Sequence, residues 1–240
     1  MAASLLPFRY FQQHNRRRTN IMSPRLEVPT PTDFNGIAKL QSAAFQEKQG
    51  CSSRDEMERE SLKAYQTYHT KHRQKLEHCR IIKSAEDDSI IVAACQLQVE
   101  GDPGDLTFPA DMRHKLQPAE VYVEWIACHP DHTGKGLGSK LLKLAESYAK
   151  ETVNARTLTL NVLQGNGGAV RLYERKGFVV KPDPHAGGAC EDLLSKCFVF
   201  CCMGCRYCTV LYMEKDLVAG TTGETPVTTD PPPTQEGMER

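Results

Sequence analysis

Three glycines at alternate positions precede an apolar, lysine-containing stretch in the middle of the chain. They are Gly134, Gly136 and Gly138, within the segment HPDHTGKGLGSKLL at residues 129–142. A strand that ends at Cys128, a glycine-rich turn and a helix beginning near Gly138 would gather unpaired backbone N–H groups at the positive end of a helix dipole. Because glycine has no side chain, a phosphate can approach such a backbone closely. The segment therefore predicts an anion site, although the same glycines would also suit a turn with only a structural use.

The spacing of this turn excludes two common phosphate loops. A Walker loop requires Gly-Lys followed by Ser or Thr, and neither Lys135 nor Lys140 is followed by either residue. A dinucleotide-binding fingerprint requires its third glycine three residues after the second, whereas Gly136 and Gly138 are two residues apart. Another kind of phosphate-containing ligand, or a turn with only a structural use, would explain these glycines.

The elements that would position this turn alternate along the chain. Apolar residues at helical or alternating spacing, with Gly and Pro at the breaks, predict a succession of strands and helices. A strand, a helix and a strand across residues 121–162 require two parallel strands joined by a crossover, and the remaining strands make the sheet mixed. The strands are expected at residues 25–28, 81–84, 90–99, 121–128, 157–162, 178–181 and 208–215, and the helices from Thr32 or Asp33 onward and over residues 55–79, 138–151 and 169–176.

The two ends of the chain differ in composition from the middle. Residues 1–24 contain no acidic residue and several arginines, which is typical of either a basic flexible arm or a mitochondrial or plastid presequence. Residues 219–240 are rich in Pro, Thr and Gly and have little to bury, which predicts a disordered tail. Residues 25–218 are predicted to form one globular domain.

The overall composition excludes several classes of protein. The 240 residues are 40% hydrophobic and 25% charged, and no apolar run is long enough to span a bilayer. The formal net charge is zero, so no global attraction to nucleic acid is expected. Without a secretory signal, the ten cysteines indicate a reducing compartment. We expect a cytoplasmic protein, with mitochondrial or plastid import through the arginine-rich N-terminus as the alternative.

Six of the ten cysteines are crowded between Cys190 and Cys208. Within this segment, CFVFCCMGCRYC at residues 197–208 has spacings that suit a metal site or lipidated thiols, and the latter would give weak membrane association. The thiols are bunched and not split into two distant pairs, which disfavours zinc. Buried structural thiols are therefore the preferred interpretation, and no metal is expected.

Two motifs in order carry a resemblance to a known family. ACHPDHTGKGLGSKLL, followed after one strand by NVLQGNGGAVRLYERKGF, resembles the GNAT superfamily of acyl-CoA-dependent N-acyltransferases. In that family an Arg/Gln-x-x-Gly-x-Gly/Ala turn holds the CoA pyrophosphate. Thr133 departs from this pattern, which removes a side chain but no backbone donor. The second match is carried by Asn166, Ala169, Leu172, Tyr173, Gly177 and Phe178. The close match covers about residues 121–178, and the order of elements extends it over residues 26–217.

The resemblance implies an α/β (α+β) fold. It is expected to be a mixed, mostly antiparallel sheet of about seven strands with helices on both faces. In that fold the central parallel pair splays apart, and the pantetheine arm of CoA lies in the gap. Because parallel strands normally stay paired, we predict a β-bulge near Ala127 or Cys128 that opens the gap.

The resemblance also implies acetyl-CoA as co-substrate and direct acetyl transfer to a primary amine. The Cys128 backbone N–H is expected to stabilise the oxyanion. The residues expected to bind acetyl-CoA are Ile126, Ala127, Cys128, Thr133, Gly134, Lys135, Gly136, Leu137, Gly138, Ser139, Asn166, Ala169 and Tyr173.

Three side chains are candidates for proton transfer. An amine needs a base at neutral pH, and Glu124 lies two residues before the CoA-contacting stretch, where family members often place one. Alternation along the strand puts Tyr122, Glu124 and Ile126 on one face, so Tyr122 is a reserve candidate. A carboxylate merely paired on the sheet surface would look the same in sequence. Tyr173 resembles the family's general acid, which protonates the departing thiolate.

Several functions remain open at this stage. An N-acetyltransferase is favoured, over a non-catalytic acetyl-CoA-binding module or a membrane-peripheral scaffold that uses the cysteine-rich segment. The acceptor is a small arylalkylamine or polyamine, or a protein amino group. Its walls are expected to come from the helix at residues 55–79 and the loop at residues 101–120, and both carry mixed charge.

Overall fold

A computed structural model describes residues 26–49, 53–184 and 210–218. The basic arm at residues 1–24, the tail at residues 219–240 and the cysteine-rich segment therefore lie outside the described residues. The described strands form one seven-stranded sheet in the order β1-β2-β3-β4-β5-β7-β6. Their bounds are Leu26–Glu27 (β1), Cys79–Lys83 (β2), Ile91–Gln98 (β3), Glu120–Cys128 (β4), Thr157–Leu163 (β5), Val179–Lys181 (β6) and Val210–Asp216 (β7).

The pairing of these strands matches the expected fold. Within the described part of the chain, β4 and β5 run parallel, and every other neighbouring pair is antiparallel. The parallel pair lies in the middle of the sheet and is connected by a helix, as a crossover requires. The prediction of a mixed, mostly antiparallel sheet with a central parallel pair is confirmed.

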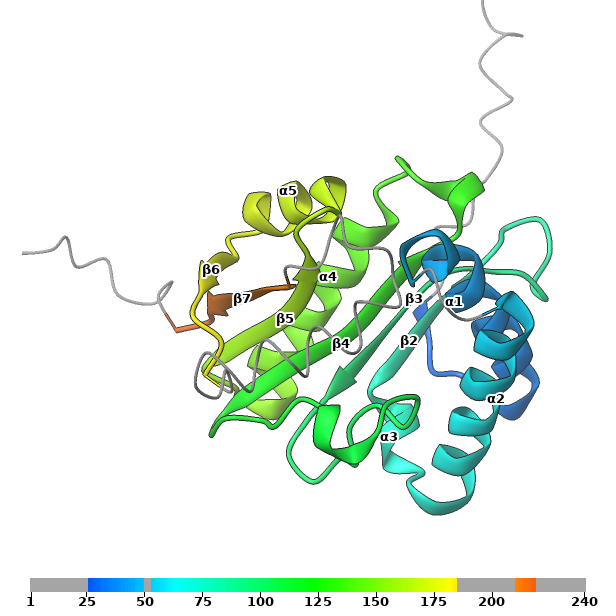
Figure 1. Cartoon of the computed structure of the whole chain (residues 1–240), viewed down its shortest axis with the longest axis horizontal. Helices are drawn as coiled ribbons and strands as arrows, with labels where there is room; N and C mark the ends of the chain where they lie inside the picture. The colour runs from blue at the N-terminus through cyan, green and yellow to red at the C-terminus, as the bar shows by residue number, and fades with distance from the viewer. Residues whose placement is uncertain (1–25, 50–52, 185–209, 219–240) are drawn as a thin grey trace, which may run out of the picture.

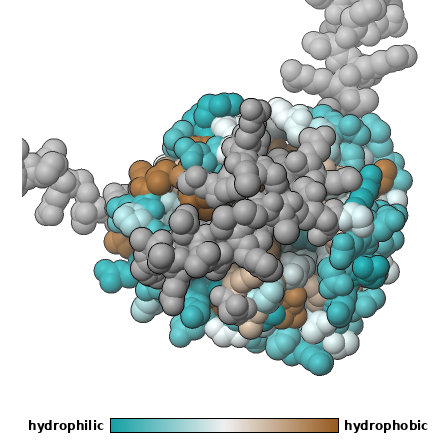
Figure 2. All heavy atoms as spheres, in the orientation of Figure 1, coloured by the Kyte–Doolittle hydropathy of each residue, from teal (hydrophilic) through white to brown (hydrophobic). Residues whose placement is uncertain are grey.

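Helices cover both faces of the sheet (Figure 1). On one face, α1 (Phe34–Gln49) and α2 (Arg54–Lys71) bury apolar residues such as Ile37 and Tyr65 against β2 and β3. On the other face, α4 (Leu137–Tyr148) buries Leu141, Leu142 and Ala145, which form one stripe at helical spacing. The π-helical turn Ala149–Val153 follows α4, and α5 (Gly167–Arg175) packs on the same side. Figure 2 shows that the outer surface over α2 is largely hydrophilic, as expected for an amphipathic helix.

The entry to α1 differs slightly from the expectation. A one-turn 3-10 helix, Pro31–Asp33, precedes α1, and its N-cap is Thr30. The Asp33 carboxylate accepts a hydrogen bond from the Thr30 backbone N–H at 2.8 Å. The cap therefore lies earlier than Thr32 or Asp33, because the proline supplies the first turn.

The prediction of a single helix over residues 55–79 is wrong beyond Lys71. The helix α2 ends at Lys71, the single turn α3 (Gln74–Glu77) follows, and Cys79 already begins β2. At His72 the backbone leaves the helical region, with φ −137°. The spacing of the apolar residues does not reveal this break, because Leu76 of α3 packs in the same cluster as the apolar residues of α2.

A β-bulge interrupts the antiparallel pairing of β3 with β4. Gln96 pairs with Trp125, whereas the next residue of β3, Leu97, pairs with Val123. The pairing therefore passes over Glu124, and β4 contains one residue more than β3 over this stretch. The bulge in β4 lies at Glu124.

The bulge was predicted near Ala127 or Cys128, but both of these residues pair regularly with β3, and the bulge of β4 lies three residues before Ala127. The extra residue also changes which side chains share a face further along the strand. The expected common face of Tyr122, Glu124 and Ile126 does not extend to Ile126, which packs in the cluster against α4. Ala127 packs on the opposite side, against α1 and α2.

Candidate active site

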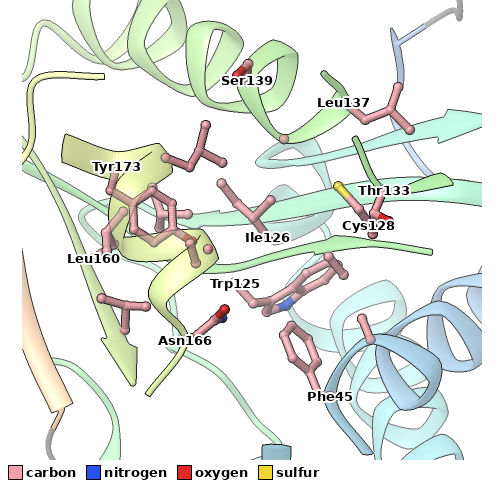
Figure 3. Close-up of a pocket in the computed structure, with 18 of the residues that line it drawn as sticks. Phe45, Trp125, Ile126, Cys128, Thr133, Leu137, Ser139, Leu160, Asn166 and Tyr173 are labelled. Carbon is pink, nitrogen blue, oxygen red and sulfur yellow. The ribbon is translucent and has the colours of Figure 1, made fainter. Parts of the chain in front are cut away.

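The two parallel strands diverge partway along their length. β4 and β5 pair only from Glu120 with Thr157 to Val123 with Leu160, although both strands continue beyond that point. A cavity of about 610 Å³ opens where the pairing stops, and its walls come from β4, β5, the start of α4, and α5 (Figure 3). The unpaired edges of two strands offer backbone hydrogen-bonding groups to an extended ligand. The predicted wedge between the parallel strands is thus present.

The glycine turn forms one end of this cavity. Gly134 and Gly136 have φ values of 74° and 77°, a left-handed conformation that strains other residues. Gly136 directly precedes α4, whose first N–H groups have no acceptor within the helix. Gly138 has a different use, because a Cβ there would lie 3.2 Å from Leu172 Cδ2. Two glycines permit the turn, and the third allows α4 to approach α5.

The cavity brings together almost all the residues expected to bind acetyl-CoA. The exception is Lys135, which does not line the cavity and whose Nζ lies 3.3 Å from His132 Nδ1. Thr133 lines the cavity, and its hydroxyl donates a hydrogen bond to the Pro130 carbonyl at 3.0 Å, which closes the turn locally. The expected residues that line the cavity are Ile126, Ala127, Cys128, Thr133, Gly134, Gly136, Leu137, Gly138, Ser139, Asn166, Ala169 and Tyr173.

Tyr173 reaches into the cavity from α5 (Figure 3). Its ring lies 6.0 Å from that of Phe178, so the tyrosine is held by packing at the end of α5. Burial, with a smaller contribution from the nearby Cys128 thiol, raises the pKa of Tyr173 to about 12. The hydroxyl therefore stays protonated at neutral pH and can donate a proton to a stronger base.

Glu124, the bulge residue, lines the cavity, but its side chain is only 2% exposed. Its Oε1 accepts a hydrogen bond from Lys75 Nζ at 2.8 Å. Burial raises the pKa of Glu124 to about 8, although the charge of Lys75 acts in the opposite direction. Its Oε2 is buried and has no hydrogen-bond partner among the described residues. The carboxylate is thus paired, but inside the protein and not on the sheet surface.

The comparisons with known proteins agree with this geometry. The model of the acetyltransferase (GNAT) family matches residues 38–178. This chain belongs to the GNAT acetyltransferase family. Its fold is also that of the PaiA N-acetyltransferase from Thermoplasma acidophilum in complex with coenzyme A, with a TM-score of 0.52 and 16% identity over 81% of this chain and 99% of that one.

Two curated relatives share part of the sequence. Streptothricin acetyltransferase of Streptomyces lavendulae is 35% identical over 78 residues, which cover 32% of this chain and 41% of the relative. The S-(2-succino)cysteine N-acetyltransferase of Bacillus subtilis (strain 168) is 29% identical over 97 residues, covering 39% of this chain and 52% of the relative. The GNAT chain thus spans about half or less of the length of the curated relatives it matches.

The reserve base, Tyr122, is not part of the GNAT cavity. Its ring stacks on that of His114, with centroids 3.9 Å apart. Burial raises the pKa of Tyr122 far above its ordinary value, and the nearby carboxylates, first that of Glu124, raise it further. Because Tyr122 is packed beside the cavity and not in its wall, the structure does not bring it together with Tyr173.

Sequence reasoning missed part of the cavity wall. Ala44 and Phe45 of α1, Leu172 and Arg175 of α5 all line it. The spacing of Leu172 from the expected Ala169 puts both on one helical face, a signal that could have identified Leu172. Phe45 carried no such signal, because on α1 it is one more apolar residue of the buried stripe. Figure 3 shows Phe45 with Trp125 at the α1 end of the cavity.

The described residues contain neither a metal site nor a membrane span. No group of three or more His, Cys, Asp or Glu side chains in the described ranges could hold a metal ion. Nor does any helix described by the structure combine the length and the apolar character needed to cross a bilayer. Among the described residues, Cys79 and Cys95 are buried free thiols.

Proposed function

We propose that this GNAT protein transfers the acetyl group of acetyl-CoA directly to the primary amine of a small molecule. The observation that carries the proposal is the wedge between β4 and β5. The cavity in this wedge is lined by the glycine turn before α4 and also by Tyr173 and Glu124. A wedge of this kind suits an extended thioester with a diphosphate at one end. Family membership supports the same reaction.

The backbone of residues 134–139 would bind the diphosphate of acetyl-CoA. The first N–H groups of α4 have no acceptor within the helix and lie at the positive end of its dipole, which favours an anion. The pantetheine arm would then run along the unpaired edges of β4 and β5. This path places the thioester near Cys128, whose backbone N–H would stabilise the oxyanion.

The amine attacks the thioester carbonyl, so that a C–N bond forms and the C–S bond breaks. Glu124 would take the proton that the amine loses through a water molecule in the cavity, because its side chain is only 2% exposed and leaves little surface for direct contact with the amine. Tyr173 would give a proton to the departing CoA thiolate. The products are the acetylated amine and CoA, and no acyl-enzyme is needed.

The acceptor end of the cavity favours an amine with an apolar body. Phe45 and Trp125 supply aromatic wall at this end, and Glu124 is the one carboxylate among the described residues that line the cavity. A polyamine carries several ammonium groups and would need several carboxylates. The two curated relatives are named for streptothricin and S-(2-succino)cysteine, both small molecules, which supports a small acceptor over a protein amino group.

A turnover screen tests this proposal. Purified protein with acetyl-CoA should release free CoA in the presence of arylalkylamines, more slowly with polyamines, and more slowly still with peptides that carry a lysine or a free N-terminus. The Glu124→Gln variant should lose at least about 100-fold in kcat/KM and keep its affinity for acetyl-CoA. Retained binding without turnover for any amine would instead support a non-catalytic acetyl-CoA-binding module. The absence of any melting-temperature response to millimolar acetyl-CoA would overturn both.

A further inference from the structure

A chain of polar and charged side chains, most of them buried, extends from the cavity wall away from the expected reacting atoms. It runs from Glu124 through Lys75 to Asp102 and His78, which come from β4, α3, the turn after β3, and the residue before β2. The side chains of Lys75 and Asp102 are 0% exposed. Burying an ionised group is costly unless it is paired, so a buried chain of this length needs an explanation.

Lys75 is at the centre of this chain. Its ammonium donates to Glu124 Oε1 at 2.8 Å and to the Leu97 carbonyl at 3.1 Å. Asp102 Oδ2 lies 3.6 Å from the same nitrogen. The ammonium thus has three acceptors within reach, which matches its three donors. Asp102 Oδ2 is in turn held by His78 Nδ1 at 2.8 Å and by the Val99 backbone N–H at 3.0 Å.

Two irregularities of the fold bring Lys75 and Glu124 together. The break at His72 separates α3 from α2, and Gln96 Nε2 then binds the Lys75 carbonyl at 3.0 Å. The bulge adds Glu124 to β4 at the register shift beside Leu97. The backbone carbonyl of Leu97 also accepts a hydrogen bond from Lys75. Both irregularities contribute to this one contact.

We propose that Lys75 is a positioning residue for acetyl transfer, which favours the ionised form of Glu124 and orients it as a base, while Asp102 and His78 hold Lys75 in place. This inference rests on the proposed function. The physical reason is that a buried carboxylate gains its proton readily unless a cation is in contact with it. Glu124 Oε1 is tied to Lys75, so Oε2 is the oxygen that remains to accept a proton.

The charged groups around Glu124 explain why Lys75 affects the ionisation of its carboxyl group. The charges of Asp102 and Asp105 oppose ionisation of Glu124, and Lys75 favours it. Three other titratable groups face this region, and burial keeps all of them neutral: Tyr68 of α2, Tyr122 of β4 and Cys79 of β2. The charge of Arg113 lowers the pKa of Tyr68. Removing Lys75 should therefore make Glu124 harder to ionise, and removing Asp102 should make it easier.

Opposite pH shifts in two variants test the inference. In Lys75→Met the rising limb of the plot of kcat/KM against pH should move to higher pH by more than about one unit. At pH 7, kcat/KM should fall at least about tenfold. In Asp102→Asn the same limb should move to lower pH. Lys215→Met removes a lysine that is paired at 2.7 Å with Glu146, outside the cavity, and should leave the limb unchanged. The KM for acetyl-CoA should stay the same in all three.

A direct titration separates this inference from the proposed function. Carbon-13 NMR of the Glu124 carboxyl in the full chain should show the same opposite shifts without any substrate, even if no amine is ever acetylated. The effect of Lys75→Met on kcat/KM should also vanish in a Glu124→Gln background, since Lys75 acts through Glu124. An unchanged Glu124 titration in Lys75→Met would overturn the inference, as would shifts of the same sign in both variants. If Lys75→Met does not fold, Lys75→Gln, which keeps a hydrogen-bond donor but no charge, should give the same shift to higher pH, and an unchanged Glu124 titration in that variant would overturn the inference.

Discussion

At the scale of single residues, burial raises the pKa of two different groups in the cavity and suits each to a different proton transfer. Burial raises the pKa of Tyr173 to about 12 and that of Glu124 to about 8. For the tyrosine this shift keeps the hydroxyl protonated at neutral pH, so that a proton donor is present when the thiolate leaves. For the carboxylate it brings the loss of the proton close to neutral pH, where a base is useful.

Tyr173→Phe should therefore separate chemistry from binding. Loss of the hydroxyl removes the proton donor for the leaving thiolate, so kcat should fall by about 10²-fold or more. The dissociation constant of CoA should change little, since the ring that lines the cavity is kept. Steady-state kinetics and calorimetric titration with CoA would measure the two effects. An unchanged kcat would remove Tyr173 from the mechanism, and rescue by thiol leaving groups of lower pKa would support it.

At the scale of elements, the turn between β4 and α4 is shaped by backbone conformation more than by side chains. Gly134 and Gly136 both adopt positive φ, and a Cβ at either position would meet nothing within 4 Å. Their constraint is thus conformational and not steric crowding. The position of the first amides of α4 depends on these two residues.

Gly136→Ala should reduce both stability and acetyl-CoA binding. A left-handed conformation costs a non-glycine residue about 1–2 kcal/mol, so the free energy of unfolding should fall by that amount. The strain should also displace the amides that face the diphosphate. Gly167→Ala is a matched control, because Gly167 has no positive φ and does not line the cavity. Equal urea midpoints for the two variants would contradict this account of the turn.

At the scale of the whole molecule, another buried carboxylate, that of Glu120, joins the loop at residues 101–120 to the parallel strands. Glu120 accepts hydrogen bonds from His114 Nε2 at 2.9 Å, from the Gln117 backbone N–H and from the Thr159 hydroxyl. Burial opposes its ionisation, but these hydrogen bonds outweigh burial and lower the pKa of Glu120 below its ordinary value of 4.5. The stabilisation they provide is therefore complete above pH 4.5 and is lost as the pH falls through the folded-state pKa.

Glu120→Gln should make the protein less stable by about 1–3 kcal/mol at pH 7, because buried donors lose a charged acceptor. The difference from the unmodified protein should shrink as the pH falls through the lowered folded-state pKa of Glu120, where the carboxylate becomes protonated. Urea unfolding followed at several pH values would measure it. Asp88→Asn, which changes an exposed carboxylate, should match the unmodified protein throughout. A difference for Glu120→Gln that persists undiminished at low pH would contradict the assignment.

The sequence by itself determined the local features of this GNAT protein. The glycine turn, the order of strands and helices and the position of Tyr173 on α5 depend on residues close together in the chain, so spacing and residue type reveal them. The wedge could be expected from the family resemblance carried by the same motifs. Only Lys135, among the residues expected to bind acetyl-CoA, lies outside the cavity wall.

The tertiary structure alone decided where the bulge lies and what Glu124 contacts. The bulge depends on the register between β3 and β4, which no single strand encodes, and its shift by a few residues moved Ile126 to the other face. The partner of Glu124 is Lys75, 49 residues earlier, on a helical turn that the apolar spacing merged with α2. Contacts between distant segments follow from packing the whole chain, and local patterns carry no record of them.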